Sequence, residues 1–201
     1  MPVQVLLASQ SPRRRALLQE AGIPLRLLQP GSEHEDRVPA GFSPAERALH
    51  LAREKALGAQ LDGSDGLLLA SDTVVALAGR CFSKPRDRQE AQSFLLELEG
   101  REHEVWTAIA LAPVLGGVLD AQALRSEAHL ARVRFRSFEP GELESYLDSG
   151  EWRDKAGGYG IQAAAGAFAA LVSGELATVI GLPLTAVLAH WHGFQKEGEL
   201  R

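Results

Sequence analysis

The sequence predicts an α/β protein built on a mixed, twisted sheet that helices flank. Short, mostly apolar runs at 3–8 and 67–70 are typical of buried strands. Ser-Pro pairs at 11–12 and 43–44 are typical of helix starts. The run at 129–135 alternates apolar and polar residues, which indicates a half-exposed strand. Strands and helices are mixed, and neighbouring strands of the second half are expected to be antiparallel.

In the first half, strands and helices alternate. Ser11 suits an N-cap and Pro12 a first helical position, and Gly22 is expected to end that helix. The helix that follows Ser43 has apolar residues on one face. The expected elements are a strand at 3–8, a helix at 12–21, a strand at 25–28, an acidic loop at 31–37, a helix at 44–56, a strand at 67–70 ending at Ser71-Asp72-Thr73, an extended stretch at 74–77 and a turn at 78–80.

Glycines divide the second half. Gly100 closes a predicted helix, and Gly116-Gly117 marks a hairpin turn. The expected elements are a helix at 88–98, strands at 105–111 and 129–135, a helix at 140–147, a glycine-rich loop at 150–160, a strand at 168–172, a turn at 173–175, a helix at 184–192 and a frayed polar tail from about 195. No repeat or linker interrupts the chain, so residues 1–201 are predicted to form a single domain.

Composition excludes several classes of protein. The 201 residues are 45% hydrophobic and 23% charged, which is typical of a globular chain rather than a disordered one. The single cysteine, Cys81, excludes an internal disulfide and a cysteine-built zinc site. The net charge of −5 disfavours a nucleic-acid binder. Neither a membrane-spanning run nor a secretion signal is found, so we expect a cytoplasmic protein with no membrane partner.

The arginines at 13–15 stand in the first turn of the first predicted helix. This is electrostatically unfavourable, because a helix N-terminus is already positive. A bound anion would explain the cluster, since backbone N–H groups, Ser hydroxyls and guanidinium groups would converge on a phosphate. The alternative is a capped helix with solvated arginines. The phosphate-binding glycine motifs of P-loop and dinucleotide-binding proteins are absent from the sequence.

Acidic residues and lysines add to this candidate site. Asp72 follows an apolar strand, where α/β proteins often place metal ligands and general bases, although a turn or cap is the simpler interpretation. Glu33, Glu35 and Asp36 could contribute a second acid for Mg²⁺ or Mn²⁺, or could be solvated charges. Only four of the 21 basic residues are lysines, and three of these, Lys55, Lys84 and Lys155, are predicted at helix ends or in loops, where they could meet a polyanion. The alternative is a favourable charge at a helix C-terminus for Lys55 and solubility for the other two.

Five sequence blocks, taken in order, resemble the Maf family over roughly residues 3–192. The blocks are Leu-Ala-Ser-Gln-Ser-Pro-Arg-Arg at 7–14, Ser-Asp-Thr-Val-Val at 71–75, Lys-Pro at 84–85, Asp-Lys-Ala-Gly-Gly-Tyr-Gly-Ile-Gln at 154–162 and Val-Ile-Gly-Leu-Pro-Leu at 179–184. The resemblance implies an inosine-triphosphatase-like α/β fold with two lobes around a central cleft, and possibly a homodimer. It also implies a nucleoside triphosphate pyrophosphatase that cleaves between the α- and β-phosphates with a divalent metal cation, Mg²⁺ or Mn²⁺.

The resemblance also implies roles for individual residues. Asp72 would be the catalytic proton acceptor and, with Glu33, would hold the metal; counting back from 42–44 instead matches Glu35-Asp36 to the family's acidic pair. Arg13, Thr73 and Gln162 match the branch that prefers dTTP and UTP, and would set the base preference. The phosphate side would be lined by Ser9, Arg14, Lys55 and Lys84.

Two rival functions stay open at this stage. One is a pyrophosphatase for 7-methyl-GTP, the other branch of the family, against which the bulky Arg13 and Gln162 argue. The other is a nucleotide-binding regulator of cell division, a role to which Maf proteins have been linked through septum formation. The order of preference among dTTP, UTP and modified pyrimidine nucleotides, and the preferred metal, are not predicted.

Overall fold

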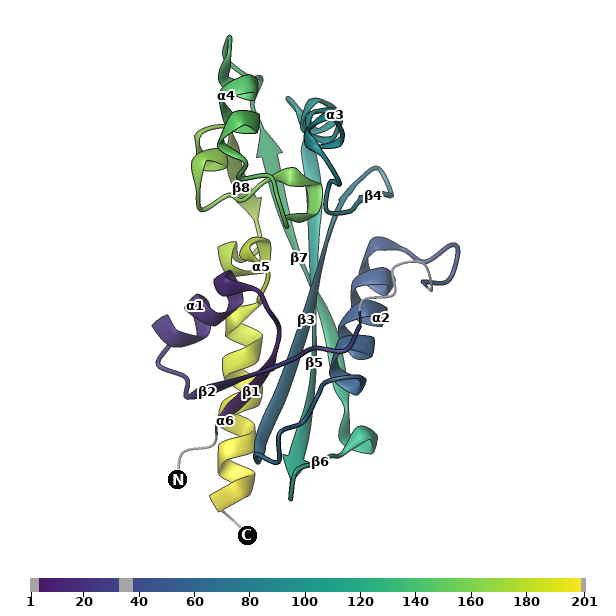
Figure 1. Cartoon of the computed structure of the whole chain (residues 1–201), viewed down its shortest axis with the longest axis vertical. Coiled ribbons are helices and arrows are strands. Elements are labelled where there is room, and N and C mark those ends of the chain that lie inside the picture. Colours follow the sequence, from purple (N-terminus) through teal and green to yellow (C-terminus); the bar gives the residue numbers. More distant parts are fainter. Residues whose placement is uncertain (1–3, 33–37, 200–201) are drawn as a thin grey trace.

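The computed structural model describes residues 4–32 and 38–199, which form a mixed sheet flanked by helices (Figure 1). The strand order is β2-β1-β3-β5-β7-β8, with β4 beside β3 and β6 beside β5. The strands are β1 (Val5–Ala8), β2 (Leu25–Leu28), β3 (Gly66–Leu77), β4 (Arg80–Phe82), β5 (Glu102–Leu115), β6 (Val118–Leu119), β7 (Arg125–Phe135) and β8 (Ala169–Ser173). Strands β1, β2 and β3 are parallel, and the other pairs are antiparallel, which confirms the predicted fold class.

Helices cover the sheet in three groups. The helices are α1 (Pro12–Glu20), α2 (Pro44–Leu57), α3 (Arg88–Leu98), α4 (Glu142–Ser149), α5 (Leu176–Ile180) and α6 (Leu184–Glu199). Helix α2 packs on one face of β1, β3 and β5, while α1 and α6 pack on the opposite face. A third core forms at the other end of the sheet beneath α3 and α4. No helix in the described residues is long and apolar enough to cross a membrane.

Four predicted helix starts are confirmed, α4 begins two residues later than predicted, and the predicted end of the last helix is wrong. Ser11 caps α1, and Ser43 caps α2 in a reciprocal pair with Glu46. Helix α6 continues to Glu199 instead of ending at His192 ahead of a frayed tail from about residue 195. Trp191 and Phe194 still pack against the core beneath α6, so burial of apolar surface favours the additional turns.

Strand β3 corrects the predicted position of Asp72. The sequence predicted a strand that stops at Ala70, with Asp72 just past its end. Instead β3 continues unbroken to Leu77, and Asp72 lies in its middle. The antiparallel partner β5 explains the difference, because it pairs with β3 from Gly66 to Ala76.

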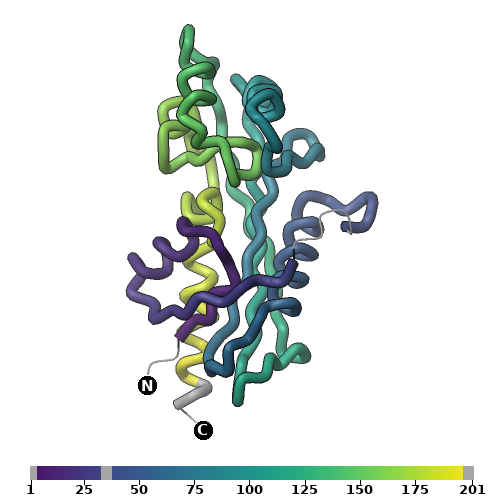
Figure 2. The backbone as a smooth tube through the Cα atoms, in the orientation of Figure 1, coloured from purple at the N-terminus to yellow at the C-terminus, as the bar shows by residue number. Residues whose placement is uncertain are grey.

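Strand β3 continues past Ala70, but its pairing with β1 ends there. Strand β1 pairs with residues 67–70 of β3, and β4 pairs with residues 75–77 on the same edge, since β5 occupies the other edge. Within the part of the chain that the structure describes, residues 71–74 have no strand partner on this edge. The sheet therefore has a gap where the α1–α2 half of the molecule meets the α3–α4 half, at the middle of the tube in Figure 2.

Candidate active site

A cavity of about 380 Å³ lies at this gap in the sheet. Its walls come from the end of β1, the first turn of α1, the last turn of α2, the middle of β3 and the loop at 154–162. Every predicted site residue that the structure describes lines it: Ser9, Arg13, Arg14, Lys55, Asp72, Thr73, Lys84 and Gln162. Glu33, Glu35 and Asp36 lie outside the described residues, so their predicted metal-binding role stays a prediction.

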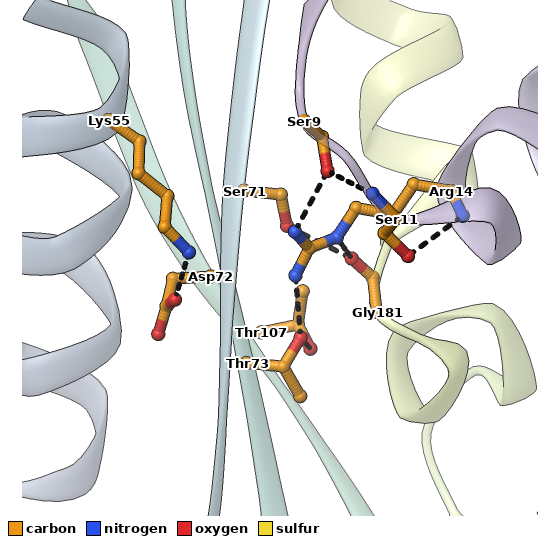
Figure 3. A network of polar contacts seen from close by, with 9 residues as sticks. All are labelled: Ser9, Ser11, Arg14, Lys55, Ser71, Asp72, Thr73, Thr107 and Gly181. Carbon is orange, nitrogen blue, oxygen red and sulfur yellow. Dashed lines mark hydrogen bonds and ion pairs between the residues drawn. The ribbon is translucent and has the colours of Figure 1, made fainter. Parts of the chain in front are cut away.

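A buried ion pair stands on the α2 side of β3. Lys55 Nζ lies 2.5 Å from Asp72 Oδ1, and the two side chains are only 5% and 10% exposed (Figure 3). Lys55 is buried in the last turn of α2, so its ammonium group lies on Asp72 instead of in solvent. A buried charge without a partner costs several kcal/mol, by order of magnitude, which explains why these two residues occur together.

A hydrogen-bond network occupies the opposite side of β3. Successive residues of a strand point to opposite faces, so Thr73 points away from Asp72 and toward α1 (Figure 3). Arg14 donates from Nε to the Gly181 carbonyl at 2.7 Å, and from its terminal nitrogens to Ser9 Oγ at 3.3 Å and Thr73 Oγ1 at 3.2 Å. These protein acceptors show that Arg14 is not the solvated arginine of the simpler interpretation.

The loop at 154–162 closes the other end of the cavity. Arg13 donates to the Asp154 carbonyl at 3.4 Å, and Gln162 is an exposed residue of the cavity wall. Burial lowers the pKa of Arg13, while the Asp154 charge acts in the opposite direction. Burial also lowers the pKa of Lys155, and the neighbouring Arg13 charge adds to this effect.

Sequence reasoning missed part of this site. Lys155 was predicted to meet a polyanion or to aid solubility but was not among the predicted site residues, and it lines the cavity. Ser71 and Thr107 are fully buried and belong to the network, as does the Gly181 carbonyl. The available signal was a hydroxyl residue beside an apolar run, at 71 after the run 67–70 of β3 and at 107 before the run 108–112 of β5.

The described residues that line the cavity include two carboxylates, Asp72 and Asp154. Across residues 4–32 and 38–199, no group of three or more His, Cys, Asp or Glu side chains could hold one. Asp72 still fits a Mg²⁺ ion of the kind that phosphate-processing sites use, which is held by one or two carboxylates together with the oxygens of the bound phosphates.

Fold and site together define an α/β enzyme with a polar, cation-lined cleft of small-molecule size. The chain belongs to the Maf family, because the model of that family, described as Maf-like protein, matches residues 4–193. The resemblance carried by the five sequence blocks is thereby confirmed.

Three relatives show how close this membership is. The chain is 43% identical over 180 residues, 90% of each chain, to the dTTP/UTP pyrophosphatase of Hyphomonas neptunium. It is 41% identical over 199 residues, 96% of each chain, to the dTTP/UTP pyrophosphatase of Anaeromyxobacter dehalogenans. The protein of that name from Bordetella bronchiseptica is 42% identical over 191 residues, which are 91% of this chain and 88% of the relative.

Proposed function

We propose that the protein hydrolyses dTTP and UTP to the nucleoside monophosphate and pyrophosphate, as a house-cleaning enzyme of the nucleotide pool. The observation that carries the proposal is the single cavity that holds the Asp72–Lys55 pair together with Arg13, Thr73 and Gln162. The relatives named dTTP/UTP pyrophosphatase support the same activity.

The phosphate side is proposed to lie between α1 and α2. Ser9 Oγ accepts hydrogen bonds from the Ser11 backbone N–H at 3.2 Å and from Arg14 at 3.3 Å. Both lone pairs of that hydroxyl are then in use, so what remains for a ligand is its proton. A hydroxyl that can only donate suits a phosphate oxygen, and the lysines at 55 and 84 add positive charge to the same cavity.

Asp72 is proposed to act as the proton acceptor. A water oxygen would form a bond to the α-phosphorus while the bond from that phosphorus to the bridging oxygen of the β-phosphate breaks. The water proton would pass to the Asp72 carboxylate, and pyrophosphate would leave with the bridging oxygen. Asp72 would also supply a ligand for a divalent cation, Mg²⁺ or Mn²⁺, which when bound would neutralise phosphate charge.

The base is proposed to bind toward the loop at 154–162. Gln162 carries an amide N–H donor, which matches the carbonyl oxygens of uracil or thymine. Arg13 is fixed beside this loop by the Asp154 carbonyl. A base that left these groups unpaired would bind poorly, which is the proposed origin of the pyrimidine preference.

A nucleotide panel tests the proposal. Pyrophosphate release is measured with dTTP, UTP, CTP, GTP and 7-methyl-GTP while Mg²⁺ and Mn²⁺ are titrated. We expect dTTP and UTP to be hydrolysed fastest, with one pyrophosphate released per monophosphate. Preference for 7-methyl-GTP would overturn the substrate assignment. Tight nucleotide binding with no turnover under any metal condition would instead support a regulatory protein.

A further inference from the structure

Thr73 stands in a chain of hydroxyl hydrogen bonds that leads into the protein interior. Thr73 and Thr107 are cross-strand partners in β3 and β5, and their Oγ1 atoms lie 3.0 Å apart. Thr107 is completely buried, and its Oγ1 lies 2.7 Å from the Thr178 carbonyl at the end of the chain of contacts. Thr73 Oγ1 thus contacts both Thr107 and the Arg14 guanidinium, and the three side chains lie together in Figure 3.

The protons of this chain can be assigned by counting. A threonine hydroxyl has one proton to donate and two lone pairs that accept. A carbonyl oxygen can only accept, and a guanidinium group can only donate. The Thr178 carbonyl can only accept, so the Thr107 proton is directed to it. The bond between the two hydroxyls must then use the Thr73 proton. Arg14 can only donate, so it occupies one lone pair of Thr73.

One lone pair is therefore all that Thr73 retains for a ligand in the cavity that it lines. We infer that Thr107 is a positioning residue that holds the Thr73 hydroxyl as a pure acceptor, and that Thr73 thereby recognises the N3–H group of a uracil or thymine base. The inference rests on the proposed function and deepens it. It gives Thr107 a part in specificity although Thr107 does not line the cavity.

A Thr73 hydroxyl that can only accept distinguishes uracil and thymine from cytosine. Uracil and thymine present a proton at N3, whereas cytosine presents a lone pair there. If the Thr73 hydroxyl can only accept, it forms a hydrogen bond with the N3–H group of uracil or thymine. With cytosine, its lone pair would face the lone pair at N3. An unmade hydrogen bond at a desolvated site costs more than a made one gains, so cytosine would be rejected.

Gly181 keeps this arrangement in place. A Cβ atom at position 181 would lie 3.3 Å from both Arg14 Nε and Thr73 Oγ1. The absence of a side chain thus lets the guanidinium and the hydroxyl meet beside the Gly181 carbonyl, which accepts from both Arg14 and Ser71.

The inference is tested by kcat/KM for UTP and CTP in the unmodified protein, in Thr107→Val and in Thr107→Ser. Valine matches threonine in shape but cannot accept the Thr73 proton, which can then turn toward cytosine N3. We expect the ratio of UTP to CTP to fall about tenfold in Thr107→Val and to stay unchanged in Thr107→Ser, which retains the hydroxyl. A Thr107→Val protein that hydrolyses UTP with an unchanged ratio would overturn the inference, because a merely structural role would slow both substrates alike.

Two substrate analogues provide a test that needs no variant. A sugar hydroxyl could also supply a donor to Thr73, and the analogues separate the two sources. N3-methyl-UTP lacks the base donor and should be a poor substrate, whereas 3′-deoxy-UTP should be hydrolysed like UTP. The reverse pattern would place Thr73 on the sugar and overturn the inference. Failure of the unmodified protein to hydrolyse any pyrimidine nucleotide would instead count against the proposed function itself.

Discussion

The Asp72 carboxylate and the Lys55 ammonium group meet inside the protein, on the side of β3 that faces α2. Neither residue was predicted to have the other as its partner, since sequence reasoning placed Asp72 at a strand end and Lys55 at a helix end. The position of Lys55 near the end of a helix is correct, whereas Asp72 lies in the middle of β3 rather than at a strand end. The contact between them depends on how α2 packs across the sheet, and local sequence does not specify that packing.

The first prediction concerns the proposed proton acceptor. Asp72→Asn keeps the size of the side chain but removes its basicity, so we expect kcat for dTTP to fall by about 10³-fold. Asp154→Asn is the matched control, because it changes the second carboxylate that the structure places in the cavity wall, and asparagine tolerates the positive φ of 58° at that position. The control should lose far less activity. Equal losses in the two variants, measured as pyrophosphate release, would contradict the role of Asp72.

The second prediction concerns the cost of breaking the ion pair. Lys55→Met leaves the Asp72 charge buried without this partner, so the free energy of unfolding should fall by about 3–5 kcal/mol. The double variant Lys55→Met/Asp72→Asn removes both charges and should regain part of that loss. Urea unfolding at neutral pH measures both effects. A double variant less stable than Lys55→Met would show that the pair does not act as a unit.

At the scale of elements, the gap in the sheet edge explains why one cavity collects residues from both faces of β3. Strands β1 and β4 each pair with one end of the same edge, and in the part of the chain that the structure describes residues 71–74 between them have no strand partner there. The extra length of β3 and β5 was not predicted, because a continuous strand and two short ones have the same apolar pattern. Only the pairing of the two strands with each other distinguishes these cases.

The third prediction concerns the turn between α5 and α6. Gly181 has a φ of +122°, and a methyl group there would press on Arg14 and Thr73, so Gly181→Ala should cost about 1–3 kcal/mol of stability. Gly193→Ala is the control, because the exposed position 193 lies in α6 with no heavy atom within 4 Å, and alanine should stabilise that helix by about 0.5–1 kcal/mol. Thermal unfolding compares the two variants. Unfolding temperatures that shift in the same direction in both variants would contradict this prediction.

At the scale of the whole molecule, the fold class and the family could be predicted from sequence because they rest on capping signals, apolar runs and five ordered motifs. The hydroxyl network could not, because it joins residues far apart in the chain, such as Thr107, Thr178 and Arg14. The arginine cluster at 13–15 illustrates the difference. Its position indicated an anion site, yet the structure directs Arg14 to protein acceptors and leaves Arg15 exposed.

The fourth prediction concerns acid stability. Burial lowers the pKa of His103 from 6.5 to about 4 in the folded protein, where its Nε2 lies 2.7 Å from the Tyr159 hydroxyl. The histidine of the unfolded chain binds a proton more tightly than His103 of the folded protein does. The stability that comes from a neutral His103 is therefore fully present above the pKa of the unfolded state and is lost as the pH falls toward the pKa of the folded state. At about pH 5 the loss should be on the order of 2 kcal/mol relative to pH 7.

His103→Gln removes the titrating group and provides the comparison for this prediction. Urea unfolding at the two pH values should show a smaller acid loss in the variant than in the unmodified protein. Other groups titrate in both proteins, so the difference between the two losses isolates His103. An identical loss in both would exclude a buried neutral histidine at this position.

The attack of water on the α-phosphorus is tested most directly by hydrolysis of UTP in water enriched in ¹⁸O, with mass spectrometry of both products. Since water is proposed to attack the α-phosphorus beside Asp72, the label should appear in the nucleoside monophosphate, and the pyrophosphate should carry none. Label in the pyrophosphate, or products other than monophosphate and pyrophosphate, would contradict the account.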